Sequence, residues 1–307
     1  MTARPTTLLV LAAAGALVAG CSSPPVIQAP NSFTSRTIQI VAAENFWGDI
    51  AATLGGAHVR VSSIISNPAT DPHDYEPTAF DGRLMAGAGL VIVNGIGYDP
   101  WADKLLAANQ APERVELNIG QVLNVPDGGN PHVWYSPVDV HTVVKAMVKE
   151  FQQLDPSDSA YFAAHLKTFD NTMLARYDSL VGSIKSTYAG TPIGASESIV
   201  APLAQDLGLT MLTPPSFLNA ISEGSDPTAA DKRTIDAQIS SKQIKIYVYN
   251  SQNATPDVQA QVAAAKAAGI PVATVTETLS PQTSTFQAWQ VRQLQGIQQA
   301  LHQATGK

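Results

Sequence analysis

The chain has 307 residues, of which 45% are hydrophobic and 14% are charged. At about 150 residues per domain this length favours two domains, and the composition excludes a chain that is mainly disordered. Eighteen Lys and Arg residues against 25 Asp and Glu residues give a formal net charge of −7. No basic stripe is present, so nucleic acid is not an expected partner. The single cysteine, Cys21, excludes internal disulfides, cysteine-rich zinc fingers and iron–sulfur clusters.

The first twenty residues have the pattern of a secretory signal peptide. One charged residue, Arg4, precedes an apolar stretch of about a dozen residues, which is too short to span a bilayer of about 30 Å. Small residues lead up to Cys21, as in a bacterial lipobox, so we expect cleavage after residues 1–20 and acylation of the Cys21 thiol. Residues 21–36 are expected to form a flexible stalk behind this lipid anchor, outside the cytoplasm. An ordinary signal peptide with an incidental cysteine is the alternative.

Strand-like runs alternate with helical stretches through the rest of the chain. Before residue 155 the predicted strands are 38–41, 59–61, 90–93 and 115–117, and the predicted helices are 46–54, 78–87, 98–109 and 137–153. After residue 190 the predicted strands are near 192–196, 209–212, 244–249 and 272–275, and the predicted helices are near 199–207, 228–242, 255–268 and 284–303. This alternation predicts an α/β fold with parallel sheets flanked by helices, in an N-terminal lobe (37–154) and a C-terminal lobe (190–307).

The segment between the two lobes has the longest helical pattern of the chain. Asp155-Pro156-Ser157 supplies a start signal, and apolar residues from Phe162 to Ile184, Met173 among them, recur at steps of three or four before a stop at Gly190. The pattern predicts one helix over 155–189, about 30 residues and ~45 Å long. We expect this helix to join the lobes as a rigid spine.

Four residues with metal-binding side chains lie where α/β sheets place their ligands. His73 follows the second predicted strand, and His132 precedes a helix, each in a loop bounded by prolines. Glu197 and Glu277 each follow a predicted strand of the second lobe. The pattern predicts two imidazoles and two carboxylates facing one cleft between the lobes. Glu197 also opens a helix, where the helix dipole favours a carboxylate that binds no ligand.

Four segments of the chain resemble the zinc and manganese substrate-binding lipoproteins of bacterial ABC importers. They are Asp-Pro-His-Asp-Tyr-Glu-Pro-Thr at 71–78, Val-Asn-Gly-Ile-Gly-Tyr-Asp-Pro-Trp at 93–101, Asn-Pro-His-Val-Trp at 130–134 and Val-Thr-Glu-Thr-Leu at 275–279. The resemblance implies two α/β lobes joined by one long rigid helix. It also implies one divalent metal ion, held in the cleft by His73, His132, Glu197 and Glu277.

The resemblance leaves the identity of the metal open. Glu197 stands where zinc-selective members commonly have a third histidine, which resembles the manganese-type pattern, and Glu277 stands where Asp is more frequent. Carboxylates suit Mn²⁺ or Fe²⁺, whereas the affinity order favours Zn²⁺ over Mn²⁺ on similar ligands. The His-rich loop of many zinc members is missing, because residues 107–130 contain no His. The candidate metals are therefore Zn²⁺ and Mn²⁺, with Fe²⁺ as a third.

The resemblance implies a non-enzymatic receptor that captures the metal and delivers it to an ABC transporter permease. We expect a monomer, attached to the membrane through its lipid. Two alternatives stay open. Gly194-Ala195-Ser196-Glu197-Ser198 resembles the nucleophile elbow of a hydrolase, although its fifth position is Ser and no triad partners are recognisable. The second alternative is a two-lobe binding protein for a siderophore or cobalamin.

The remaining histidines do not fit a metal motif. His58, His141, His165 and His302 have no His or carboxylate partner at metal-site spacing in the sequence, so we expect each of them to be solvated. Two local signals have structural interpretations. Thr228 is expected to cap a helix at its N-terminus, and Gly95-Ile96-Gly97 is expected to form a tight strand-to-helix turn.

Overall fold

The computed structural model describes residues 1–2, 37–68, 70, 72 and 75–307. The predicted signal peptide from residue 3 onward, the stalk with Cys21, and the candidate ligand His73 lie outside these described residues. Residues Ser35–Lys307 form one compact unit. In the part of the chain that the structure describes, no helix has both the length and the apolar character needed to cross a membrane.

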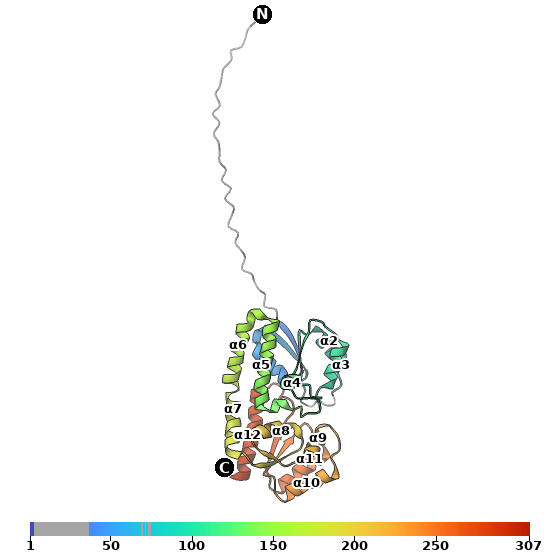
Figure 1. The fold of residues 1–307 in the computed structure, drawn as a ribbon, viewed down its shortest axis with the longest axis vertical. Coiled ribbons are helices and arrows are strands. Elements are labelled where there is room, and N and C mark those ends of the chain that lie inside the picture. Colours follow the sequence, from blue (N-terminus) through green and yellow to red (C-terminus); the bar gives the residue numbers. More distant parts are fainter. Residues whose placement is uncertain (3–36, 69, 71, 73–74) are drawn as a thin grey trace. The chain divides into compact units, whose positions relative to one another are not determined.

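Two four-stranded parallel sheets form the framework of this unit (Figure 1). The first has the order β2-β1-β3-β4, with β1 (Ile38–Glu44), β2 (Val59–Ile65), β3 (Leu90–Val93) and β4 (Val115–Asn118). The second repeats this order as β6-β5-β7-β8, with β5 (Pro192–Ala195), β6 (Thr210–Met211), β7 (Ile246–Asn250) and β8 (Val272–Val275). All neighbouring strands run parallel. The eight predicted strands are present, and the predicted α/β fold class is confirmed.

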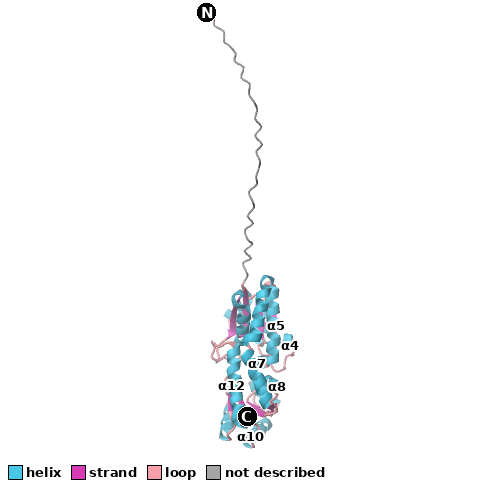
Figure 2. Cartoon of the chain, turned by 90° about the vertical axis from the view of Figure 1, so that its left-hand side faces the viewer, coloured by secondary structure: helices cyan, strands magenta, loops and turns pink. Residues whose placement is uncertain are grey.

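Helices connect consecutive strands and flank both sheets (Figure 2). In the first half they are α1 (Asn45–Gly55), α2 (Ala79–Gly87), α3 (Pro100–Ala108), α4 (Ile119–Leu123) and α5 (Pro137–Leu154), with the 3₁₀ turns η1 (Gly56–His58), η2 (Val133–Tyr135) and η3 (Pro156–Asp158). In the second half they are α8 (Ala201–Asp206), α9 (Pro215–Ser222), α10 (Ala229–Ser240), α11 (Pro256–Ala267) and α12 (Phe286–Thr305), with the 3₁₀ turn η5 (Ser198–Val200). The sequence pattern missed α4 and α9, which are too short to show a clear helical period.

Two local predictions, a helix cap and a tight turn, are confirmed. Thr228 caps α10, because its side chain accepts a hydrogen bond from the Asp231 backbone N–H. The turn after β3 has positive φ at three consecutive residues, Gly95 (68°), Ile96 (62°) and Gly97 (81°). The buried carboxylate of Asp99 holds this turn, since it accepts the backbone N–H groups of Asn94 and Gly95 at 2.8 Å each.

The segment that connects the two halves is helical, but it is not one uninterrupted α-helix. After η3 it consists of α6 (Ser159–Thr168), the π-helical turn η4 (Phe169–Met173) and α7 (Ala175–Tyr188). A π-turn inserts one residue into the helical register. As a result Met173, predicted on the apolar face, is 39% exposed, and Leu174 is fully buried in its place. The assignment of 155–189 as a separate linking domain, and the lobe boundaries on either side, stay predictions.

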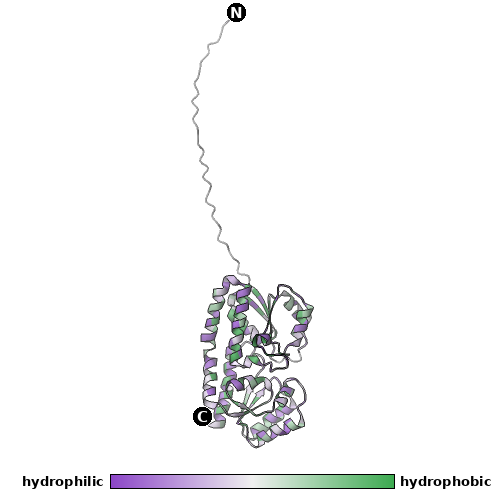
Figure 3. Cartoon of the chain, viewed as in Figure 1, coloured by the Kyte–Doolittle hydropathy of each residue, from purple (hydrophilic) through white to green (hydrophobic). Residues whose placement is uncertain are grey.

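One hydrophobic core runs through both halves of the chain. It packs a face of each sheet against α1, α5, α7 and α12, and α12 lies beside α7 along its length (Figures 1 and 2). Two smaller clusters fill the opposite faces, under α2 and α3 in the first half and under α9, α10 and α11 in the second. The apolar strands and polar outer helix faces in Figure 3 follow from this layering. The common core fixes the position of one sheet relative to the other.

Candidate metal centre

His132 is a fully buried imidazole in the loop between α4 and α5. Its Nδ1 lies 2.8 Å from Oδ1 of Asn130, which also accepts the His132 backbone N–H at 3.0 Å. The Asn130 amide nitrogen, Nδ2, donates to the Ser198 carbonyl at 2.8 Å. This contact identifies the atom that faces His132 as the amide oxygen. Since an amide oxygen can only accept, the proton of a neutral His132 ring lies on Nδ1. Nε2 then carries the lone pair, which is the form that binds a metal.

Glu277 faces this lone pair from the other half of the chain. It follows β8, is 3% exposed, and places Oε1 3.2 Å from His132 Nε2. An imidazole lone pair and a carboxylate oxygen repel each other unless a positive charge lies between them. A proton, carried by the imidazole or by the carboxyl group, or a metal ion can supply that charge.

The loop after β7 holds Glu277 in place. The Gln252 side-chain oxygen accepts the backbone N–H of Glu277, and also that of Thr278 at 2.9 Å. Its amide nitrogen donates to Thr278 Oγ1 at 2.8 Å and to the carbonyl of Pro68, which lies in the loop after β2. Gln252 therefore joins the carboxyl edges of the two sheets at the candidate site.

Glu197 is a buried carboxylate, 1% exposed, two residues after the end of β5. It precedes η5 but makes no capping hydrogen bond to that turn. Its two oxygens instead accept the side-chain amides of Asn250, through Oε1, and of Asn253, through Oε2 at 2.8 Å. These contacts hold the carboxylate in a fixed orientation, and they do not support the interpretation that Glu197 serves only to start a helix.

The hydroxyl of Tyr135 lies close enough to both carboxylates to be affected by their charges. Tyr135 follows His132 by three residues and is fully buried, and this burial raises the pKa of its hydroxyl well above the usual value. The charges of Glu277 and Glu197 raise the pKa further, against hydrogen bonds to Gln293 and Thr276 that lower it. Burial, followed by the charge of Glu197, also raises the pKa of Tyr247. Glu197 therefore acts on both of these buried tyrosines, and Glu277 acts on Tyr135.

Aromatic rings surround the imidazole on its other sides. The ring of Trp134 lies 5.2 Å from that of His132, edge to face, and stacks on Phe46 at 4.1 Å. Tyr98 contacts both rings, at 5.9 Å from His132 and 5.0 Å from Trp134. These contacts fix the ring of His132 and keep water away from it, which strengthens its interaction with charged groups.

The structure thus brings together part of the predicted ligand set. His132 and Glu277 are in contact, and Glu197 precedes Ser198, whose hydroxyl lies 3.3 Å from His132 Nδ1. The predicted fourth ligand, His73, lies outside the described residues. Sequence reasoning missed the amide side chains that orient these groups, namely Asn130, Asn250, Gln252 and Asn253. The polar run 250–253, which begins at the last residue of the buried strand β7, was the available signal for three of them.

The expectation that the other histidines are solvated is wrong for three of them. His165 is partly buried, with Nδ1 3.2 Å from the Thr53 carbonyl oxygen. His58 forms an ion pair with Asp158, with Nδ1 and Oδ2 2.7 Å apart. His141 lies between two carboxylates, with Nδ1 3.2 Å from Asp170 and Nε2 3.1 Å from Asp178. In both cases the carboxylates lie on helical segments far along the chain. Only the packing of the connecting segment against α1 and α5 creates these pairs.

The fold and the site together define a class of protein: two parallel sheets on a common helical core, with a buried imidazole–carboxylate site at the carboxyl ends of their strands. Residues 40–300 match the model of the family described as "Zinc-uptake complex component A periplasmic", and the chain belongs to this family. It is a family of uptake components and not of enzymes. The hydrolase alternative is therefore wrong, and Ser196 is a buried residue whose hydroxyl accepts the Asn250 backbone N–H at 3.0 Å.

Curated relatives resemble the chain at low identity. The manganese-binding lipoprotein MntA of Halalkalibacterium halodurans is 24% identical over 156 residues, which cover 50% of this chain and 51% of the relative. The iron-binding protein YfeA of Yersinia pestis is 25% identical over 191 residues, with 58% and 59% covered. The chain thus matches between half and three fifths of the length of these relatives.

Solved structures share the fold over nearly their whole length. A manganese-bound periplasmic metal-binding protein from Candidatus Liberibacter asiaticus aligns with a TM-score of 0.73 at 18% identity, covering 86% of this chain and 99% of that chain. The periplasmic zinc-binding protein TroA of Treponema pallidum aligns with a TM-score of 0.72 at 17% identity and the same coverage. At this identity the likeness supports the fold alone.

Proposed function

We propose that the chain is the substrate-binding component of an ABC importer for a divalent transition metal ion, with His73, His132, Glu197 and Glu277 as ligands. The contact between His132 Nε2 and Glu277 Oε1 carries this proposal, since it points a ligand-type lone pair at a buried carboxylate. Two neutral imidazoles and two carboxylates balance the charge of a divalent cation. The buried carboxylates then become favourable, because their charge is compensated.

The metal is proposed as Mn²⁺ or Zn²⁺, with Fe²⁺ as the third candidate. Glu197 and Glu277 offer oxygen ligands that can bind through both atoms, which suits the higher coordination numbers of Mn²⁺ and Fe²⁺. Relatives with manganese and iron in their names, and the word zinc in the description of the family, support the same three metals. On equal ligands Zn²⁺ binds more tightly than Mn²⁺, so the physiological metal also depends on what is available outside the cell.

The proposed mode of action is capture outside the cytoplasm and delivery to a membrane permease. Cys21 is the proposed lipid attachment point, and residues 21–36 are the proposed stalk. A relative described as a lipoprotein, and the word periplasmic in the description of the family, support this location. We propose a monomer as the working form.

Competitive loading is the experiment that tests this proposal. The purified chain is exposed to equal free concentrations of Mn²⁺, Fe²⁺ and Zn²⁺, desalted, and subjected to elemental analysis. We expect stoichiometric metal in the wild-type protein, and loss of one equivalent in the His132→Ala and Glu277→Ala proteins.

Two further variants refine the ligand set. Glu197→Ala tests whether Glu197 is itself a ligand. If it is, this variant should lose one equivalent of bound metal, as His132→Ala and Glu277→Ala do. His73→Ala applies the same test to His73, which lies outside the described residues, and should also lose one equivalent of bound metal. Unchanged metal content in the His132→Ala and Glu277→Ala proteins would contradict the proposed function.

A further inference from the structure

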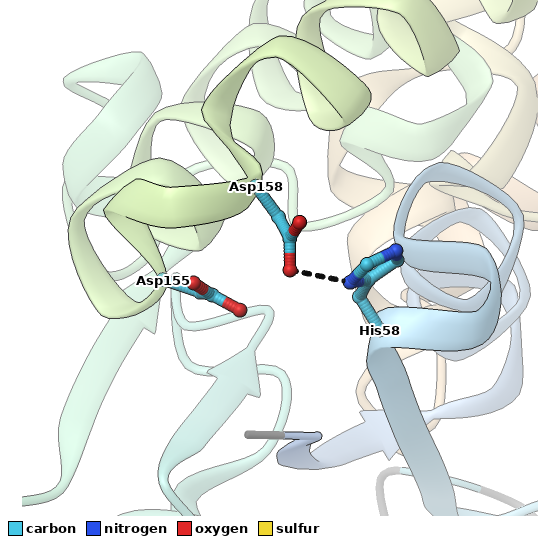
Figure 4. Close-up of side chains that lie close together, drawn as sticks. All are labelled: His58, Asp155 and Asp158. Atoms are coloured by element: carbon cyan, nitrogen blue, oxygen red, sulfur yellow. Dashed lines mark ion pairs between the residues drawn. The ribbon is translucent and has the colours of Figure 1, made fainter. Parts of the chain in front are cut away.

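A second group of metal-binding side chains lies at the amino ends of the first sheet's strands. His58 ends η1 directly before β2, Asp155 follows α5, and Asp158 ends η3. One nitrogen or oxygen of each residue lies within 4.8 Å of the other two. Figure 4 shows the Asp158 carboxylate pointing at His58 across the space between the two turns, with Asp155 on the same side of that space. These turns are about 100 residues apart in the sequence, so packing alone brings the three side chains together.

Asp155 is the unusual member of this group. It is 7% exposed, and its Oδ1 accepts a hydrogen bond from the Ser157 hydroxyl. Among the described residues, no group donates a hydrogen bond to its buried Oδ2. A buried carboxylate oxygen without a donor is costly. The ion pair between His58 and Asp158, at 2.7 Å, does not involve Asp155 Oδ2 and so does not stabilise it.

We propose that His58, Asp155 and Asp158 form a second site for a divalent transition metal ion, of which Zn²⁺ is the best match. One imidazole nitrogen and two carboxylate oxygens are ligand types that Zn²⁺ takes in proteins, and three protein ligands leave a position for water. Two carboxylates and a neutral imidazole also balance the charge of the ion. The metal replaces the His58–Asp158 contact and supplies the missing partner of Asp155 Oδ2.

This site is too far from the candidate metal centre to share its ion. The two sites lie at opposite ends of β2, whose seven residues span about 20 Å. The 18-residue helix α5 begins beside His132 and ends beside Asp155, a separation of ~27 Å along its axis. The second ion would tie the turn before β2 to the turn that starts the connecting helices. Its proposed role is therefore to hold that joint, independently of metal transport.

Zinc stoichiometry tests the second site. The full chain is equilibrated with Zn²⁺ alone at pH 7, desalted and analysed for bound metal, and its affinity is measured by titration. We expect Asp155→Asn and His58→Gln each to bind one zinc ion fewer than wild type, with the affinity of the lost site reduced by at least about 10-fold, since loss of even an outer-shell partner costs that much.

Asp170→Asn is the matched control. It also removes a carboxylate from a His–Asp pair on the connecting segment, at 3.2 Å from His141, and it should keep the wild-type zinc content. Circular dichroism confirms that each variant is folded. If folded Asp155→Asn and His58→Gln proteins bind as many zinc ions as Asp170→Asn, the group is an ion pair without a metal and the proposal is wrong.

Discussion

Asn130 determines which nitrogen of His132 carries the proton. Its amide oxygen accepts from both the ring Nδ1 and the backbone N–H of His132, and its own nitrogen donates to the Ser198 carbonyl. The residue thus links the loop before α5 to the loop after β5 and presents Nε2 towards Glu277. Loss of this orientation leaves the imidazole free to present the other nitrogen.

The first prediction follows from this role of Asn130. Asn130→Ala should weaken metal binding by about 10- to 100-fold, as expected when a partner that orients a ligand is lost. Isothermal titration with Mn²⁺ and Zn²⁺ measures the effect. Asn171→Ala, at an exposed position on η4, is the control and should bind like wild type. Equal affinities for the two variants would show that Asn130 does not orient the ring.

At the scale of elements, the π-helical turn η4 determines which residues of the connecting segment face the core. Leu174 is fully buried, whereas its neighbour Met173 is 39% exposed. A regular α-helix with the predicted period would bury Met173 instead. The two residues therefore report directly on the register of the helix.

The second prediction compares these neighbours. Leu174→Ala should lower the free energy of unfolding by about 2–5 kcal/mol, because it leaves a cavity in the core. Met173→Ala should change that free energy by less than about 0.5 kcal/mol, as for most surface positions. Urea denaturation of both proteins measures the difference. The reverse order of effects would indicate an uninterrupted α-helix.

The end of β1 carries a buried carboxylate next to the turn after β3. Burial, and then the charge of Asp99, raise the pKa of Glu44 well above its usual value. Burial also raises the pKa of Asp99 from 3.8 to about 6, despite the backbone N–H groups of Gly95 and Asn94, which lower it. For Asp99 this change corresponds to about 3 kcal/mol between its two protonation states.

The third prediction is the pH dependence that follows from these raised pKa values. The folded protein holds protons that the unfolded chain releases above pH ~4, so this contribution to stability is complete below pH ~4 and is lost as the pH rises through about 6. Glu44→Gln removes the titrating carboxyl group whose pKa is raised by burial and by the charge of Asp99. The free energy of unfolding, measured in urea between pH 5 and 9, should therefore fall less with pH than in wild type. Glu113→Gln, at an exposed position, is the control and should leave the dependence of the unfolding free energy on pH unchanged. If Glu44→Gln also has the same pH dependence as wild type, the pKa of Glu44 is not raised in the folded protein.

At the scale of the whole molecule, hydrogen bonds tie the second half of the chain to helix α1. The backbone N–H of Leu279 donates to Asn45 at 3.2 Å, and that of Phe286 donates to Asp49 at 2.6 Å. Both donors flank the segment that follows Glu277. Together with the common core and Gln252, they place the carboxylate from one half against the imidazole from the other.

The sequence predicted the eight strands and the residues at their carboxyl ends, because periodicity and strand position are local properties. Glu197 and Glu277 were predicted as ligands from this strand position, and His132 from its proline-bounded loop before a helix; their roles as ligands stay predictions. The amides of Asn130, Asn250, Gln252 and Asn253 were not, since their partners lie on other strands and loops. The π-turn was missed because one inserted residue hardly disturbs a pattern of threes and fours. The pair of His58 and Asp158 was missed because it forms only when distant turns pack together.

The central claim is that a metal ion binds between the two halves of the chain and stabilises both. The most direct test is the shift in Tm that Mn²⁺ produces in the Asp155→Asn protein, in which the proposed second site is removed. At free metal 100 times the Kd, binding contributes about 2.7 kcal/mol, which for a chain of this size corresponds to a rise of roughly 5–10 °C in one cooperative transition. Adding His132→Ala or Glu277→Ala should each abolish most of this rise, because each leaves an incomplete ligand set. A full shift in either of these proteins, or a shift confined to one of two separate transitions, would contradict a metal site shared by the two halves.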